Sequence, residues 1–169
     1  MNLHFTVHGT PAPQGSKRHV GHGVMVESSK RLPAWRTLVT DAAWAARNGA
    51  PALEGPVHLD VAFGFRRPRS HYGTGRNAER LRPSAPPWPT GRNIGDLSKL
   101  VRALEDSLTD AGVWRDDAQV VSINAKRFWW DGPGAEVRVV QPIPCVGCGE
   151  DQAVDALNRE IDRLCEDEP

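Results

Sequence analysis

The stretch GDLSKLVRALEDSLTDAGVWRDDAQVVSINAK, residues 95–126, decides the fold because a helix pattern in it is followed directly by a strand pattern. Its apolar residues recur every three or four positions, as on one face of an α-helix: Leu97, Leu100, Val101, Leu104 and Leu108. Gly112 predicts the end of that helix. Beyond it, Val121, Ile123 and Ala125 alternate with polar residues, which predicts a strand that doubles back toward the helix.

Acidic residues stand at both ends of this unit. Asp96 directly precedes the apolar run, where it is either a helix N-cap or a metal ligand. Asp116 and Asp117 introduce the strand, where paired aspartates are either solvated turn residues or ligands. Mg²⁺ prefers hard oxygen ligands and leaves part of its shell to water and substrate phosphate. The combination predicts a divalent-metal site with Asp96 and Asp117 as ligands and Asp116 as an additional acid.

A polar row lies on the same helix, away from the leucines. Ser98, Arg102 and Asp106 follow one another at intervals of four residues. Two interpretations of Arg102 stay open: it contacts a phosphate or leaving oxygen, or it pairs with Asp106 in solvent.

This segment resembles the RusA family of Holliday-junction resolvases, whose pattern is approximately D-x-D-N-L-x-K-x-x-x-D-A-L, then D-D-x-Q-V and a later Lys. Asp96 matches the first Asp, and Leu100 matches the first Leu of the pattern. The remaining matches are Asp106, Ser107 and Leu108 on D-A-L, Asp116, Asp117, Gln119 and Val120 on D-D-x-Q-V, and Lys126 on the later Lys. A weaker likeness includes Phe5, Gly9, Pro11, Pro13, Lys17 and Arg18, so the resemblance spans about residues 3–140.

The resemblance implies an endonuclease that resolves four-way DNA junctions with Mg²⁺, for which Mn²⁺ substitutes. It also implies a homodimer, whose two sites nick opposing strands symmetrically. Arg102 and Lys126 would then stabilise charge on the phosphate.

Ser98 is the largest departure from the family pattern, because it stands where the second Asp is expected. Arg102 also replaces a Lys, and Lys99 replaces an Asn. Ser98 stays among the candidate metal-site positions, and three explanations remain open: a weak natural site, ligation by Asp116 and Asp117 together, or a change that traps bound DNA. The alternative function is a junction-binding protein with weakened or lost catalysis.

The formal net charge is zero, yet the charge is unevenly distributed. Residues 1–144 hold 19 Lys and Arg against 13 Asp and Glu, whereas residues 145–169 hold 2 against 8. Within the basic part, a stretch rich in Pro and Gly predicts a loop that tracks phosphates and becomes ordered on DNA, with an inert linker as the alternative. Its cations include Arg66, Arg67, Arg69 and Arg76, and Lys17 and Arg18 are further candidate DNA contacts or an ordinary basic turn.

The rest of residues 1–144 reads as one α+β domain with a mixed sheet packed by helices. Alternating or helical apolar spacing predicts a strand over 3–7, a helix over about 35–48 and a strand over 57–65. A turn at 131–134 predicts that residues 135–139 form the hairpin partner of the strand from Val120. Trp129 and Trp130 either stack on unpaired bases at a junction or belong to a core or dimer interface.

Residues 145–169 form an acidic tail with a helix-like apolar spacing, for which a protein partner, dimerisation or screening of the basic surface are open roles. Cys145, Cys148 and Cys165 are either part of a zinc site or reduced thiols. No apolar run approaches the roughly 20 residues needed to cross a bilayer. The sequence therefore predicts a cytoplasmic protein without membrane contact.

Overall fold

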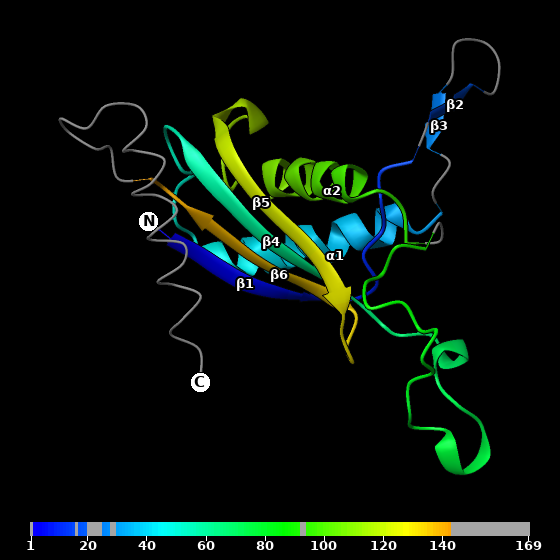
Figure 1. The fold of residues 1–169 in the computed structure, drawn as a ribbon. Helices are drawn as coiled ribbons and strands as arrows, with labels where there is room; N and C mark the ends of the chain where they lie inside the picture. Colours follow the sequence, from blue (N-terminus) through cyan, green and yellow to red (C-terminus); the bar gives the residue numbers. More distant parts are fainter. Residues whose placement is uncertain (1, 16, 20–24, 28–29, 92–93, 143–169) are drawn as a thin grey trace.

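The computed structural model describes residues 2–15, 17–19, 25–27, 30–91 and 94–142. Its elements are β1 (Asn2–His8), β2 (Lys17–His19), β3 (Met25–Glu27), α1 (Leu32–Arg47), β4 (Val57–Phe65), α2 (Leu97–Asp110), β5 (Val120–Trp129) and β6 (Gly134–Val140). Short 3₁₀ turns lie at Arg69–His71, Gly75–Asn77 and Asp117–Gln119. The predicted α+β class with a mixed sheet is confirmed (Figure 1).

The main sheet has the strand order β1-β6-β4-β5. β4 and β5 run parallel because α2 connects them in a strand-helix-strand unit, while β6 lies antiparallel to both β4 and β1. The predicted hairpin between β5 and β6 is therefore wrong. The physical reason is that β4 is buried on both faces and takes the centre of the sheet, with a neighbour on each side.

A glycine lets the short connection from β5 to β6 pass the end of β4. The backbone N–H of Trp130 donates to the carbonyl of Phe65 at 2.9 Å. A Cβ added at Gly64 would lie 2.2 Å from the Trp130 ring, so a larger residue there would push this ring away. The Trp130 ring therefore packs over Gly64 of β4.

Both helices cover one face of the main sheet, behind the strands in Figure 1. α1 contributes the buried residues Leu32, Trp35, Val39 and Ala43, and α2 contributes its leucine stripe. α1 ends at Asn48, whose left-handed backbone (φ 46°) forms the C-cap near the predicted position. Leu38 of α1 is 42% exposed because it lies at the margin of the buried face.

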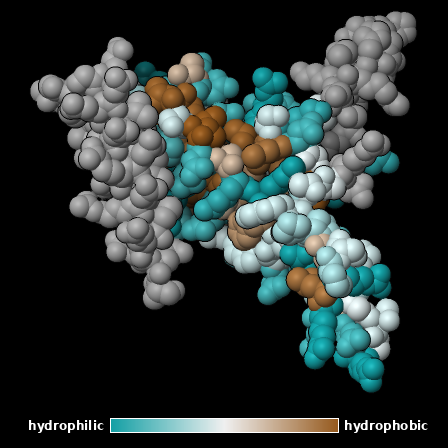
Figure 2. All heavy atoms as spheres, in the orientation of Figure 1, coloured by the Kyte–Doolittle hydropathy of each residue, from teal (hydrophilic) through white to brown (hydrophobic). Residues whose placement is uncertain are grey.

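Residues 66–91 form an arm, defined here by those bounds, that projects beyond the sheet in Figure 1. Its two limbs are joined by backbone hydrogen bonds from Gly73 to Arg80 and from Arg82 to His71, each 2.9 Å long. The arm therefore has backbone hydrogen bonds of its own, and its ordering on DNA stays a prediction. Figure 2 shows a largely hydrophilic surface on the arm, whereas hydrophobic residues gather over the sheet.

The acidic tail and its three cysteines fall within residues 143–169, outside the described residues. Within the described part, neither helix combines the length and the apolar character needed to span a membrane.

Candidate functional site

The first candidate ligand, Asp96, is the N-cap residue of α2, with the extended backbone typical of that position (φ −82°, ψ 141°). Its side chain makes no capping hydrogen bond. Instead, its Oδ2 lies 3.2 Å from the Nζ of Lys99, and both side chains are well exposed. The Asp96 carboxylate is thus held only by a surface ion pair, which a ligand can displace.

Two contacts fix the backbone immediately before Asp96. Gly95 has a φ of +83°, and a Cβ there would lie 2.5 Å from Pro13. Both the backbone angle and the close packing therefore require glycine. The guanidinium of Arg127, near the end of β5, donates to the carbonyl of Gly95 at 2.7 Å. The start of α2 is thereby tied to the sheet.

The D-D-x-Q segment forms a 3₁₀ turn at the other end of β5. Asp116 caps this turn, because its carboxylate accepts a hydrogen bond from the N–H of Ala118 at 2.8 Å. The amide of Gln119 secures it: its oxygen accepts from the N–H of Arg115 and Asp116, and its nitrogen donates to the carbonyls of Leu53 and Gly55. Asp116 thus has the structural role, and Asp117 is left exposed next to it.

The sequence interpretation missed Glu105. Burial raises the pKa of the Glu105 carboxyl, and the charges of Asp117 and Asp106 raise it further, whereas Arg102 lowers it. Glu105 is therefore a half-buried acid close enough to feel the charge of Asp117. A signal was present in the sequence, since Glu105 follows Ser98 by seven residues and thus returns to the same side of the helix.

Asp106 does not pair with Arg102 as one interpretation had it. Its carboxylate accepts from the side chain of Gln14 at 3.1 Å and lies 3.5 Å from the guanidinium of Arg36 on α1. Arg102 remains exposed on α2, as does Ser98 one turn before it. A depression of about 220 Å³ lies between the C-terminal half of α2 and the turn at Asp117, and it is lined by Arg36, Asp106, Thr109, Asp110, Arg115, Asp116 and Asp117.

Lys126 lies on the opposite face of the sheet from α2. It pairs in register with Ala62, whereas its neighbour Arg127 pairs with the buried Phe63 on the helix side. Arg127, not Lys126, is therefore the cation of β5 that reaches the start of α2. The two-residue period of a strand, counted from Ile123, would have identified Arg127, because residues 123, 125 and 127 share a face.

The carboxylates fit an incomplete magnesium site better than a closed one. Among the described residues, no three His, Cys, Asp or Glu side chains gather closely enough to hold a metal ion. Asp96 and Glu105 are nine residues apart, which is about 13 Å along a helix axis. Mg²⁺ commonly uses one or two carboxylates and completes its shell with water and substrate phosphate. Among the described carboxylates, Asp117 and Glu105, whose charges interact, and Asp96 at the start of α2 are the available donors.

The candidate DNA contacts fall on two projections. Lys17 and Arg18 belong to β2, which pairs with β3 apart from the main sheet (Figure 1). Arg66, Arg69 and Arg76 are exposed on the arm. Arg67 differs, because it donates to the carbonyl of Pro86 at 3.0 Å and lies 5.0 Å from the centre of the Trp129 ring. It therefore stabilises the arm.

Comparison with known proteins agrees with this arrangement. A family model described as endodeoxyribonuclease RusA matches residues 8–140. The chain is also 26% identical over 147 residues to a protein of Bacillus subtilis (strain 168) named "Uncharacterized protein YqaN", covering 81% of this chain and 94% of that protein. The family match contains both helices, all strands of the main sheet except most of β1, and every candidate ligand. The chain belongs to the RusA family of endodeoxyribonucleases.

Proposed function

We propose that this protein is a magnesium-dependent endonuclease that resolves four-way (Holliday) DNA junctions in recombination and repair, with Mn²⁺ as a possible substitute. The observation that carries the proposal is the family match over residues 8–140, which contains the D-D-x-Q turn. The basic character of residues 1–144 and the exposed arginines of the arm support a DNA substrate.

The donors in this proposal are Asp117 with Glu105, whose carboxyl senses its charge, and Asp96 at the start of α2 as a separate donor that does not share the same ion. When bound, Mg²⁺ would lower the pKa of a water molecule and neutralise charge on the phosphate. Ser98 lies between the two groups of donors along the helix and offers only a hydroxyl. Because no carboxylate stands on the helix between Asp96 and Glu105, an ion bound at either position would take the rest of its coordination shell from water and DNA phosphate.

In this proposal, the remaining residues bind the DNA phosphate or hold the acidic residues in position. Arg102 is exposed on the same helix, and its positive charge lowers the pKa of Glu105. An exposed guanidinium at this position suits contact with a phosphate oxygen. Gln119 holds the turn that presents Asp117, and Arg127 holds the peptide that precedes Asp96. These contacts keep the two acids on rigid elements, as a catalytic site requires.

A homodimer is part of the proposal. Two copies related by a two-fold axis present two sites, which matches the two-fold symmetry of a four-way junction and favours paired nicks in opposing strands. One chain of 169 residues is small for gripping two duplexes at once.

Ser98 favours a second candidate function, a junction-binding protein with weakened or lost catalysis. Restoring a carboxylate by Ser98→Asp separates the two candidates. If the unaltered chain binds junctions without cutting them and Ser98→Asp cuts them, the second candidate is correct.

The proposal is tested by incubating an end-labelled four-way junction and a linear duplex of the same sequence with the protein, in Mg²⁺, Mn²⁺ or EDTA. Paired nicks near the branch point, in the junction alone and only with metal, support it. Equal cutting of the duplex, or cutting in EDTA, contradicts it.

A further inference from the structure

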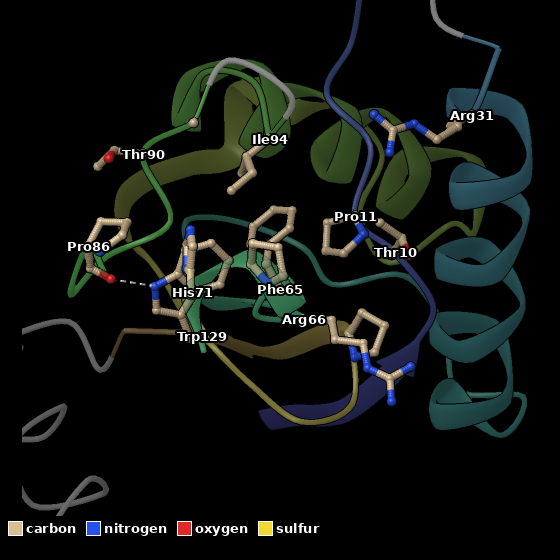
Figure 3. Close-up of a pocket in the computed structure, with 13 residues that line it drawn as sticks. Thr10, Pro11, Arg31, Phe65, Arg66, His71, Pro86, Thr90, Ile94 and Trp129 are labelled. Carbon is tan, nitrogen blue, oxygen red and sulfur yellow. Dashed lines mark hydrogen bonds between the residues drawn. The ribbon is translucent and has the colours of Figure 1, made fainter. Parts of the chain in front are cut away.

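A cavity of about 470 Å³ lies at the base of the arm, where β4 and β5 end. Its volume falls within the range of about 300–1,000 Å³ that is usual for sites of small organic ligands. Figure 3 shows the aromatic side chains of Phe65, His71 and Trp129 on one side and two arginines, Arg31 and Arg66, toward α1. The cavity therefore combines aromatic rings with cationic groups.

The aromatic wall is held in place before any ligand arrives. The Nε1 of Trp129 donates to the carbonyl of Pro86 at 3.0 Å, and Arg67 lies over its ring. His71 meets Trp129 nearly at right angles, with ring centroids 5.3 Å apart. A rigid wall of this kind loses little conformational entropy when a ligand binds.

One polar atom in this wall lacks a partner. The Nδ1 of His71 is buried and makes no hydrogen bond with any described group. This atom is shielded from the cavity as well as from solvent, so a ligand would meet the rest of the imidazole ring and not this nitrogen. None of the described residues that line the cavity is acidic, so no described carboxylate there repels an anion.

We propose that this cavity receives a single unstacked nucleobase from the branch point of the DNA, with Arg66 next to the phosphate of the same nucleotide. The inference rests on the proposed function, because a four-way junction supplies the DNA. A base has the required properties: a flat ring that stacks on aromatic side chains, polar edges that suit polar lining residues such as Thr10 and Thr90, and an attached phosphate.

The position of the cavity relative to the candidate ligands supports this occupant. Ile94 lines the cavity, and Asp96 follows it by two residues. On the other side, Trp129 lines the cavity while Arg127, two residues before it, holds the carbonyl of Gly95. A base in the cavity would therefore anchor the strand beside Asp96 and fix which phosphate is presented there. The occupied cavity gives the enzyme a means to hold the strand in one register at the start of α2.

The test uses photochemical crosslinking of full-length protein to junctions that carry 5-iodouracil at one nucleotide beside the branch point, without metal. Mass spectrometry locates the adduct. We expect it on the peptides that contain Phe65, His71 or Trp129. In the variant Gly91→Phe, a ring enters the cavity from a position where an added Cβ meets no described atom within 4 Å, and the adduct should disappear. Junction affinity should fall on the order of tenfold, the loss expected for one stacked base.

Thr74→Phe places the same ring on the exposed arm outside the cavity and should leave both adduct and affinity unchanged. Junction-selective binding with adducts only elsewhere would overturn the cavity's role and leave the proposed function intact. Loss of junction selectivity in the unaltered protein would overturn the proposed function and this inference with it. The adduct in the unaltered protein is decisive even if Gly91→Phe fails to fold.

Discussion

Arg127, near the end of β5, donates from its guanidinium to the carbonyl of Gly95, the residue before Asp96, at 2.7 Å. This bond fixes the start of α2 against the sheet. Arg127→Met keeps the length of the side chain and removes the donor. Because a hydrogen bond from a charged group contributes about 1.5–3 kcal/mol, we expect a loss of cleavage of at least about tenfold, measured as kcat/KM on a four-way junction.

Lys126→Met is the matched control for that change. Lys126 is the adjacent residue on the opposite face of β5, beside Ala62. Its replacement should leave kcat/KM within about twofold in ~0.1 M salt, where distant surface charges are largely screened. A large loss with Lys126→Met and none with Arg127→Met would show that the sequence-based choice of Lys126 was right and that the Gly95 contact is unimportant.

Gln119 secures the turn that presents Asp117, through hydrogen bonds on both sides of its amide. Gln119→Glu keeps the acceptor oxygen and replaces the donor with a charged oxygen that faces the carbonyls of Leu53 and Gly55. The free energy of unfolding, measured by urea titration, should fall by about 2–3 kcal/mol. Asn124→Asp, on an exposed position of β5, provides the control and should change it by less than about 0.5 kcal/mol.

Glu105 predicts a pH dependence of stability in the metal-free protein. Burial first, then the charges of Asp117 and Asp106, raise the pKa of its carboxyl in the folded state above the ordinary value of 4.5. The folded state therefore disfavours the ionised form. The contribution of Glu105 to stability is fully present below pH 4.5 and is lost as the pH rises through the folded-state pKa.

Glu105→Gln should remove this dependence. In urea titrations between pH 4 and pH 8 in EDTA, the variant should gain stability relative to the unaltered protein as the pH rises. Asp131→Asn changes an exposed acid elsewhere, so the stability difference between this variant and the unaltered protein should stay constant between pH 4 and pH 8. A variant that loses stability at pH 8 would show that the ionised Glu105 has a favourable partner in the folded protein.

Much of the fold follows from local patterns. The stripe of leucines predicts α2 because its period is set by burial on one side. The alternation after Val120 predicts β5, although Val121 and Ile123 are 61% and 44% exposed. The β5–β6 pairing could not be predicted this way, since the preference of β4 for the centre depends on contacts of the whole sheet. Likewise, the sequence proposes Asp117 but not Glu105, because the interaction between their charges depends on how the turn after α2 packs.

The arm arginines should contribute in two distinct ways. Arg66, Arg69 and Arg76 are exposed, so replacing all three with Gln should weaken junction binding and reduce the slope of log K against log salt. If each contacts one phosphate, the slope should change by about 2–3. Fluorescence anisotropy at several salt concentrations measures it.

The matched change on the arm is Arg67→Gln, which removes the contacts to Pro86 and Trp129. It should increase protease sensitivity of the arm and alter the salt slope by less than one. An unchanged slope in the triple variant would show that the arm does not track the DNA backbone.

The central claim is that Asp117 belongs to a metal-dependent site for cutting four-way junctions. The most direct measurement is the cleavage rate of an end-labelled junction in Mg²⁺ by the unaltered protein, by Asp117→Asn and by Asp131→Asn, the last being an exposed aspartate outside the site. The account predicts junction-specific cleavage that Asp117→Asn reduces at least about a hundredfold, the scale of a lost catalytic electrostatic group, while Asp131→Asn cuts normally. Undiminished cleavage by Asp117→Asn would contradict it.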